Sequence, residues 1–239
     1  MHKLLISTAI IGLSLFSVQA QNLEEILKDH YKASGQEKMT KVKTMVTVGK
    51  LSYVTAGMES PITIYQARPN KVRMEAQILG SKVIQTYNGT TGWMYAPAMG
   101  IAEPKEMGGS EINAVLQQVK FDSYLWNYKE KGNTLELDGS SDDGSAHKLK
   151  MTQKDGEMMT ILIDKKSHLI TGIIMKQMMG TAEATLENTM KDYKAVKGIQ
   201  TPHYTSTKVD GEVIMTRVIE SIEYNQEMDP ALFEKPVME

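Results

Sequence analysis

The stretch YQARPNKVRMEAQILGSK, residues 65–82, combines a turn with a clear strand pattern. It opens with Arg68-Pro69-Asn70, a combination that favours a turn, and then alternates polar and apolar residues up to Gly80. The apolar positions share one face of the predicted strand: Val72, Met74, Ala76 and Ile78. Strict alternation of this kind indicates a β-strand with one face in a core and the other in solvent.

The same two-residue period extends in both directions from this stretch. We expect five strands between residues 44 and 95, with gaps short enough for antiparallel hairpins. Strands are expected to resume at seven segments: 134–138, 146–153, 158–164, 168–178, 182–193, 200–209 and 212–224. The pattern predicts a mainly β (α+β) domain, with one strongly curved antiparallel sheet or incomplete β-barrel of about 11 strands.

Two segments instead have the period of an amphipathic helix. Asn22 and Glu25 resemble a capping box at the start of the first helix. The second helix, at 111–119, follows Ser110 and carries an apolar stripe of Ile112, Val115, Leu116 and Val119. Because this helix interrupts two runs of antiparallel strands, its stripe is expected to face the concave side of the sheet, as a lid.

The composition favours an apolar cavity between the sheet and this lid. Phe, Trp and Tyr make up only 6% of the chain, so few large rings are available to fill the concave side. Met is abundant, with 18 residues, and strand positions such as Met151 are among them. Flexible Met side chains suit a surface that accepts variable ligands, although an ordinary Met-rich core is the alternative.

The first twenty residues have the pattern of a signal peptide. Lys3 precedes an uncharged apolar run, and Val18 and Ala20 supply small residues before a cleavage site after Ala20. We expect residues 1–20 to be removed and residues 21–239 to form one exported, soluble domain; a retained membrane anchor is the alternative. No cysteine is present to form a disulfide or to carry a lipid anchor.

The charged residues argue against nucleic-acid binding. Removing residues 1–20 leaves 26 Lys and Arg against 29 Asp and Glu, a net charge of −3. A nucleic-acid-binding surface requires a basic excess, which this near-balance does not supply.

The sequence does not predict an active site. The histidines of residues 21–239 are isolated, and no G-x-S-x-G motif or cysteine nucleophile occurs. Residues 138–144 resemble the start of a calcium loop, but Leu149 stands where such a loop needs Glu, so a hairpin turn is favoured. We therefore predict a protein that is not an enzyme, with no catalytic residue, no metal site and no cofactor.

Three blocks together resemble a known family. They are ARPNKVRME at 67–75, TYNGTTGWMYAP at 86–97 and MDPALFEKP at 228–236. Taken in this order with the helices and strands around them, they resemble the LolA/LolB-like superfamily, especially the branch of outer-membrane lipoprotein-sorting proteins. The resemblance spans nearly all of residues 21–239. It departs at Ala67, where the carriers usually have a basic residue, and at Ala96 and Ala98.

The resemblance implies a periplasmic protein, an incomplete barrel whose cavity shields acyl chains in transit between the inner and outer membranes. Arg68 matches the family arginine that holds the lid closed and is needed for cargo release. The implied cavity lining comprises Val72, Met74, Ala76, Ile78, Trp93, Ile112, Val115, Leu116, Val119 and Met151. The implied partners are an acylated lipoprotein or another lipid, an inner-membrane donor protein and an outer-membrane acceptor protein. We expect a monomer without stable membrane insertion.

Two further readings remain open. One is a periplasmic sensor on the same fold, which binds lipid and a regulatory protein partner. The other is a structural protein with a filled core, or an export-associated enzyme. Fold alone does not choose the cargo or decide between a carrier and a sensor.

Overall fold

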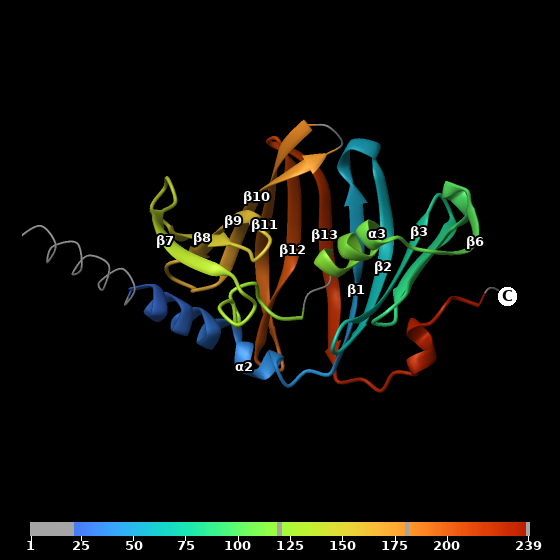
Figure 1. The fold of residues 1–239 in the computed structure, drawn as a ribbon, viewed down its shortest axis with the longest axis horizontal. Coiled ribbons are helices and arrows are strands. Elements are labelled where there is room, and N and C mark those ends of the chain that lie inside the picture. The colour runs from blue at the N-terminus through green and yellow to red at the C-terminus, as the bar shows by residue number, and fades with distance from the viewer. Residues whose placement is uncertain (1–21, 119–120, 180–181, 238–239) are drawn as a thin grey trace, which may run out of the picture.

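The computed structural model describes residues 22–118, 121–179 and 182–237. Thirteen strands form one antiparallel sheet, which is not closed into a barrel (Figure 1). The first six strands are β1 (Thr44–Tyr53), β2 (Met58–Ala67), β3 (Lys71–Ile78), β4 (Ser81–Tyr87), β5 (Gly92–Ala96) and β6 (Ile101–Glu106). The others are β7 (Thr134–Ser140), β8 (Ala146–Thr152), β9 (Met158–Asp164), β10 (Ile170–Met179), β11 (Ala182–Val196), β12 (Ile199–Val209) and β13 (Glu212–Tyr224).

The strand order is β6-β5-β4-β3-β2-β1-β13-β12-β11-β10-β9-β8-β7. All paired strands are consecutive in sequence except β1 and β13, and the consecutive strands β6 and β7 form the two edges. The chain contains helical residues at 22–34, then α2 (Gln36–Met39) and α3 (Gly109–Gln118). Short 3-10 turns follow at η1 (Val54–Ala56), η2 (Pro97–Met99) and η3 (Pro230–Phe233).

The expected number of about 11 strands is too low. The segment 101–106, which contains Pro104, forms β6 rather than a loop. Proline removes a ladder donor and is tolerated at an edge, and β6 is one of the two edge strands of the sheet. Pattern reading discounted this segment because of that proline.

The connection from β6 to β7 joins the two edges of the sheet and runs over one of its faces. We call this face, which carries Val72 and Met74 and contacts α3, the inner face. The connection consists of α3 followed by a turn-rich segment over residues 121–133. We call residues 121–133 the lid segment. Figure 1 shows α3 in front of the strands on the β1 side of the sheet.

Three apolar clusters cover the inner face. The α3 cluster joins Val115, Ile112 and Leu116 of α3 to Ile62, Ile64 and Val72 of the sheet. The N-terminal cluster packs Leu23, Ile26 and Leu27 of the first helix against β7 to β10. The mouth cluster lies near α2 and includes Val42, Met45, Ile199, Ile219, Ile222 and Tyr224.

Gly92 sets how closely the β6–α3 connection approaches the sheet. A Cβ atom built at this position would lie 2.6 Å from the Met107 Cε and 3.1 Å from the Ile112 Cγ1. The Met107 amide also donates to the Gly92 carbonyl oxygen at 2.8 Å. A side chain on residue 92 would therefore force the Met107 side chain to move and would crowd Ile112 of α3.

The C-terminal segment covers part of the opposite, outer face. Phe233 in η3 is only 2% exposed. The Arg73 guanidinium donates to the Leu232 carbonyl oxygen at 3.1 Å, and Asn88 donates to Glu234 at 2.8 Å. The polar side of β3 is therefore partly covered by the chain's own C-terminal residues. Among the described residues, no helix is long and apolar enough to cross a membrane.

Candidate functional site

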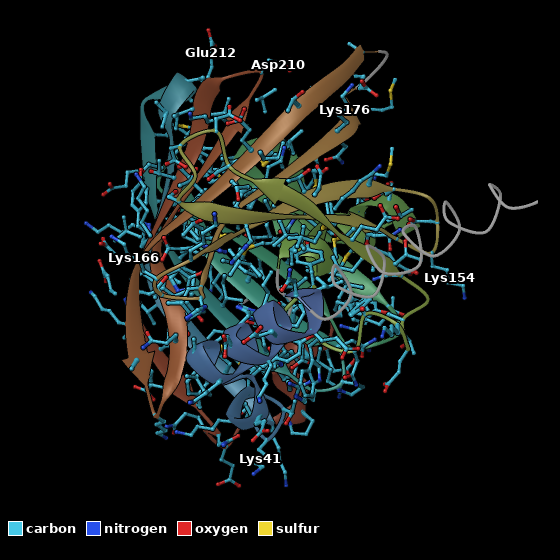
Figure 2. The ribbon with its side chains drawn as sticks, turned by 90° about the vertical axis from the view of Figure 1, so that its left-hand side faces the viewer. Lys41, Lys154, Lys166, Lys176, Asp210 and Glu212 are labelled. Carbon is cyan, nitrogen blue, oxygen red and sulfur yellow. The ribbon has the colours of Figure 1, made fainter. Side chains whose placement is uncertain are left out.

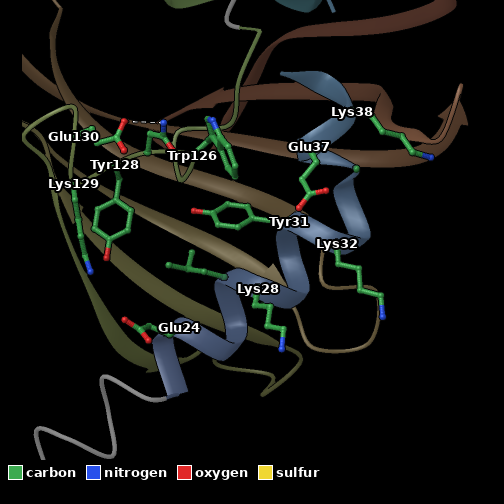
Figure 3. Close-up of a pocket in the computed structure, with 13 residues that line it drawn as sticks. Glu24, Lys28, Tyr31, Lys32, Glu37, Lys38, Trp126, Tyr128, Lys129 and Glu130 are labelled. Atoms are coloured by element: carbon green, nitrogen blue, oxygen red, sulfur yellow. Dashed lines mark hydrogen bonds between the residues drawn. The ribbon is translucent and has the colours of Figure 1, made fainter. Parts of the chain in front are cut away.

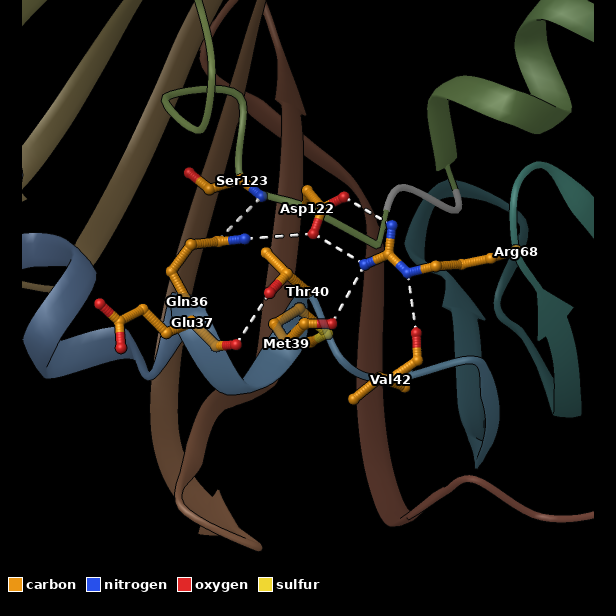
Figure 4. A network of polar contacts seen from close by, with 8 residues as sticks. All are labelled: Gln36, Glu37, Met39, Thr40, Val42, Arg68, Asp122 and Ser123. Atoms are coloured by element: carbon orange, nitrogen blue, oxygen red, sulfur yellow. Dashed lines mark hydrogen bonds and ion pairs between the residues drawn. The ribbon is translucent and has the colours of Figure 1, made fainter.

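Arg68 connects three separate parts of the chain at one end of the sheet (Figure 4). It lies in the turn between β2 and β3, and its Nε donates to the Val42 carbonyl oxygen at 2.7 Å. Its Nη2 donates to the Met39 carbonyl oxygen, at the end of α2, at 3.1 Å. The guanidinium thereby supplies a donor to the Met39 carbonyl oxygen, at an end where an α-helix leaves carbonyl oxygens without intrahelical partners.

The same guanidinium holds the lid segment through Asp122. Nη1 lies 2.8 Å from Oδ2 and Nη2 lies 2.8 Å from Oδ1, which is a two-pronged, charge-assisted pairing. The Phe121 ring lies 4.7 Å from the guanidinium carbon, within range of a cation–π contact. We call Arg68, Asp122 and their direct partners the clamp.

Gln36 adds a second attachment from α2 to the lid segment. Its Nε2 donates to Asp122 Oδ1 at 3.1 Å, and its Oε1 accepts from the Ser123 backbone amide at 3.4 Å. Gln36 is buried, so these bonds are shielded from competing water. The lid segment is thus tied to both Arg68 and α2.

The electrostatics of the clamp favour the ionised pair. The hydrogen bonds from Arg68 hold the pKa of Asp122 below its ordinary value, against the opposing effect of partial burial. Both side chains keep some solvent contact, with 28% of Arg68 and 22% of Asp122 exposed. The clamp is therefore a moderately strong contact that can open, not a permanently buried ion pair.

A cavity of about 420 Å³ lies beside the clamp. Its lining joins the β2–β3 turn to α3 and the lid segment: Arg68, Pro69, Asn70, Lys71, Leu116, Phe121, Asp122, Ser123, Tyr124, Lys131, Asn133 and Gln153. Arg68, Asp122 and Lys131 give the cavity a polar, charged part, and Leu116, Phe121 and Tyr124 give it an apolar part.

The residues predicted to line the apolar cavity are divided among several places. Five of them meet in the α3 cluster: Val72, Met74, Ile112, Val115 and Leu116. Ala76 and Ile78 continue the same face of β3 and are partly exposed. Met151 is fully buried in the N-terminal cluster, which covers the other half of the inner face. Val119 lies outside the described residues.

Trp93 requires a correction. The strand register places Trp93 opposite Thr86, and Thr86 opposite Arg73, so Trp93 lies on the outer face. Met94, the next residue, lies opposite Gln85 and packs with the α3 cluster. Neighbouring strand residues point to opposite faces. A motif that identifies the strand therefore does not reveal whether Trp93 or its neighbour Met94 points inward.

The predicted cavity over the inner face is not confirmed. Val72 is 1% exposed and Val115 is 2% exposed, because the side chains of α3 fill the space above β2 and β3. The first helix fills the other half of the inner face in the same way. An apolar ligand would have to displace these side chains.

A larger groove lies elsewhere, between the first helix and the lid segment (Figure 3). It has a volume of about 740 Å³, and Tyr31 and Trp126 form its base with ring centres 5.1 Å apart. Burial raises the pKa of Tyr31 to about 12. Seven of its lining residues are charged, and Leu27, Tyr31, Trp126 and Tyr128 add apolar surface. The charged residues are Glu24, Lys28, Lys32, Glu37, Lys38, Lys129 and Glu130.

The end of the sheet opposite the clamp carries exposed apolar side chains. Antiparallel neighbours alternate in direction, so the β1–β2, β3–β4 and β5–β6 turns share one end, away from Arg68. Their turns hold Val54, Leu79 and Met99, of which Leu79 is 80% exposed. Figure 2 shows Lys176, Asp210 and Glu212 at this end and Lys41 at the clamp end. We call these three turns the apolar rim.

Sequence reasoning identified Arg68 but missed its partners. Asp122 lies in a turn-rich segment, and Gln36 lies in a helix of four residues. Neither segment has a hydrophobic period from which its position in the fold could be predicted. Within the described ranges, no group of three or more His, Cys, Asp or Glu residues is arranged to hold a metal ion.

Comparison with solved structures identifies the fold. A LolA superfamily protein from Nitrosomonas europaea superposes with a TM-score of 0.59 at 8% identity, over 89% of this chain and 97% of that one. A putative outer membrane lipoprotein-sorting protein domain from Vibrio parahaemolyticus gives 0.55 at 10% identity, over 85% and 95%. A DUF1329 family protein from Desulfovibrio piger gives 0.59 at 13% identity, over 87% and 97%.

At such low identity these likenesses establish the fold alone. No family model matches the chain, and no curated protein matches it. The resemblance to LolA-like proteins inferred from the three sequence blocks is confirmed at the level of structure.

Proposed function

We propose that this protein is a periplasmic carrier that shields the acyl chains of a lipid or lipoprotein against the inner face of its open sheet, with no covalent chemistry. The observation that carries the proposal is the clamp: a lid segment that crosses an apolar face and is tied to the β2–β3 turn by the two-pronged Arg68–Asp122 pair. A filled structural core needs no such fastening at its edge.

The apolar clusters provide the binding surface once the clamp opens. Ile112, Val115 and Leu116 contact the sheet through side chains alone, and the lid segment after them has no ladder to a strand. Lifting α3 exposes Val72, Met74 and their neighbours, and an acyl chain restores the lost apolar contact. Binding is then an exchange of one apolar partner for another, which keeps the net free energy small and release possible.

The flexible side chains on this face suit a ligand of variable shape. Met74, Met94 and Met107 belong to the α3 cluster, and Met151, Met159 and Met175 belong to the N-terminal cluster. Thioether side chains adapt to irregular apolar surfaces at little cost.

The apolar rim gives the carrier a place to contact a membrane. Exposed apolar side chains at turn tips enter the interfacial region of a bilayer, and Leu79 is the most exposed of those at the rim. The rim lies at the end of β3 that is opposite to Arg68, so membrane contact and the clamp occupy opposite ends of the same strands.

A vesicle-to-vesicle transfer assay tests the proposal. Donor vesicles contain a pyrene-labelled phospholipid, acceptor vesicles contain none, and transfer is followed by the loss of pyrene excimer fluorescence. A carrier accelerates transfer in proportion to its concentration. A sensor binds the lipid without accelerating its transfer, and a protein with a permanently filled core does neither.

A further inference from the structure

The middle of the inner face contains a positively charged side chain that has no partner among the described residues. Arg217 lies on β13 and is opposite Leu51 of β1 on one side and Thr205 of β12 on the other. Leu51 packs with the α3 cluster, and Met190, opposite Thr205, packs with the N-terminal cluster. Since directly opposed residues point to the same face, Arg217 points to the inner face, between the two clusters.

The surroundings of Arg217 do not satisfy it. Its Nε is shut off from solvent and has no hydrogen-bond partner, although part of the side chain remains accessible. Its two cross-strand neighbours, leucine and threonine, carry no charge. Desolvation lowers the pKa of the guanidinium, but an arginine remains protonated at neutral pH.

A second nitrogen without a partner lies diagonally across from Arg217. His203 on β12 precedes Thr205 by two residues, so it shares the inner face. Its Nδ1 donates to the Ile219 carbonyl oxygen at 2.9 Å, which leaves the proton on that nitrogen. Its buried Nε2 has no partner. A neutral His203 therefore offers a lone pair, and a protonated His203 offers a second donor.

A buried charge and two buried nitrogens without partners destabilise a fold unless a ligand satisfies them. The site lies among three apolar clusters, because Ile219 of the mouth cluster is the next inner-face residue after Arg217 on β13. A ligand that fits has one anionic oxygen group for Arg217 and a long apolar part for the clusters. Guanidinium donors match carboxylate and phosphate oxygens in geometry as well as in charge.

We propose that Arg217, assisted by His203, binds the anionic headgroup of an acyl lipid on the inner face. This inference rests on the proposed lipid-carrier function and adds the ligand class: an acyl chain that bears a carboxylate or a phosphate. The head group then lies in the middle of the sheet, and the chain lies beneath α3 or the first helix.

The test compares ligands that differ only in the head group. Palmitate and 1-hexadecanol compete with the neutral apolar dye N-phenyl-1-naphthylamine for the purified protein. A second arm compares phosphatidylglycerol with diacylglycerol of the same chains, so that a preference for carboxylate and a preference for phosphate are told apart. We expect at least one anionic lipid to bind about 10-fold or more tightly than its uncharged counterpart.

Substitutions of Arg217 test whether this residue causes the preference for anionic lipids. Arg217→Met keeps an apolar stem of similar length, and we expect it to remove the preference while binding of 1-hexadecanol stays within about twofold. Arg217→Lys should restore part of the preference. Lys50→Met is the matched control, because Lys50 precedes Leu51 on β1 and points to the outer face, where it is half exposed.

The outcomes separate this inference from the proposed function. Equal binding of charged and uncharged ligands by the wild-type protein, or an unchanged preference in Arg217→Met, would overturn the headgroup site and leave the carrier intact. Absence of binding of all four ligands would overturn both. The wild-type comparison decides the matter even if a variant does not fold.

Discussion

Arg68 and Asp122 face each other as a two-pronged pair, with each of two guanidinium nitrogens 2.8 Å from a different carboxylate oxygen. The pair joins the β2–β3 turn to the lid segment, which are 54 residues apart in sequence. The remaining guanidinium donors reach the carbonyl oxygens of Met39 and Val42. One side chain therefore links the lid segment, α2 and the sheet, and Gln36 adds a second link between α2 and the lid segment.

Arg68→Leu should open the lid without unfolding the sheet. Charge-assisted hydrogen bonds of this kind contribute ~1–2 kcal/mol after allowance for solvent, so the open population should rise about tenfold. Hydrogen exchange of backbone amides in residues 121–133 measures this directly. Amides in β1, β2 and β13 serve as the internal reference and should keep their protection.

Arg68→Lys is the matched variant for geometry. A lysine keeps the charge but cannot donate to both oxygens of Asp122 and to two carbonyl oxygens at once. We expect the protection of the amides of residues 121–133 against hydrogen exchange to lie between that of wild type and that of Arg68→Leu. If both variants exchange like wild type at 121–133, the clamp does not hold the lid. In the transfer assay, delivery should suffer more than loading in Arg68→Leu, because release depends on the balance between open and closed lid.

Asp122→Asn tests at which pH the ionised Arg68–Asp122 pair contributes to stability. Arg68 holds the pKa of Asp122 below its unfolded value of ~4, so the carboxylate's contribution to stability is complete above that value. This contribution is lost as the pH falls through the lower pKa of the folded state. Denaturant unfolding should therefore give a constant stability difference of ~1–2 kcal/mol between wild type and Asp122→Asn from pH 5 to 8. The difference should shrink below pH 4; a difference that changes between pH 6 and 8 would assign the effect to another group.

Met74→Lys tests whether the inner face of β3 is the binding surface. Met74 packs with the α3 cluster, so a lysine there places a charge among apolar side chains and should abolish loading or lower stability by ~2–4 kcal/mol. Gln77→Lys adds the same charge to the exposed outer face of the same strand and should change neither. Loading is read as displacement of N-phenyl-1-naphthylamine by lipid. Equal loading by wild type and Met74→Lys would place the binding surface elsewhere.

Leu79→Asp tests the apolar rim. Leu79 is 80% exposed and stabilises no described cluster, so the variant should keep the wild-type melting temperature. It should sediment less with vesicles, and collision-dependent lipid transfer should slow several-fold, because a charge at the turn tip opposes entry into the interface. Leu79→Ala, with less apolar area and no charge, should lie between the two. Unchanged vesicle binding in both variants would show that Leu79 of the apolar rim does not contact the membrane.

Most of the fold was predictable because its signals are local. The alternation at Val72, Met74, Ala76 and Ile78 identifies β3, and the 3.6-residue spacing of Ile112, Val115 and Leu116 identifies α3. β6 was missed because Pro104 is a breaker inside a sheet and is tolerated at an edge, and no local pattern says where the edge will be.

The site was predictable only in part, because its contacts are long-range. Arg68 was found through a motif, whereas its partner Asp122 lies in a segment without a repeat period. Trp93 was placed on the wrong face because register, which sets the facing of each residue, depends on pairing with β4. Arg217 occupies a strand position where alternation predicts an apolar residue, and only the sheet register reveals that it faces inward.

We propose that the inner face accepts one acyl lipid beneath the clamped lid. Titration of the purified protein with the fluorescent fatty acid cis-parinaric acid, combined with native mass spectrometry of the complex, tests this most directly. We expect saturable binding of one molecule per chain, lost in Met74→Lys and kept in Gln77→Lys. A wild-type protein that shows no saturable binding, and no mass increase at any ligand concentration below the ligand's own aggregation limit, would contradict it.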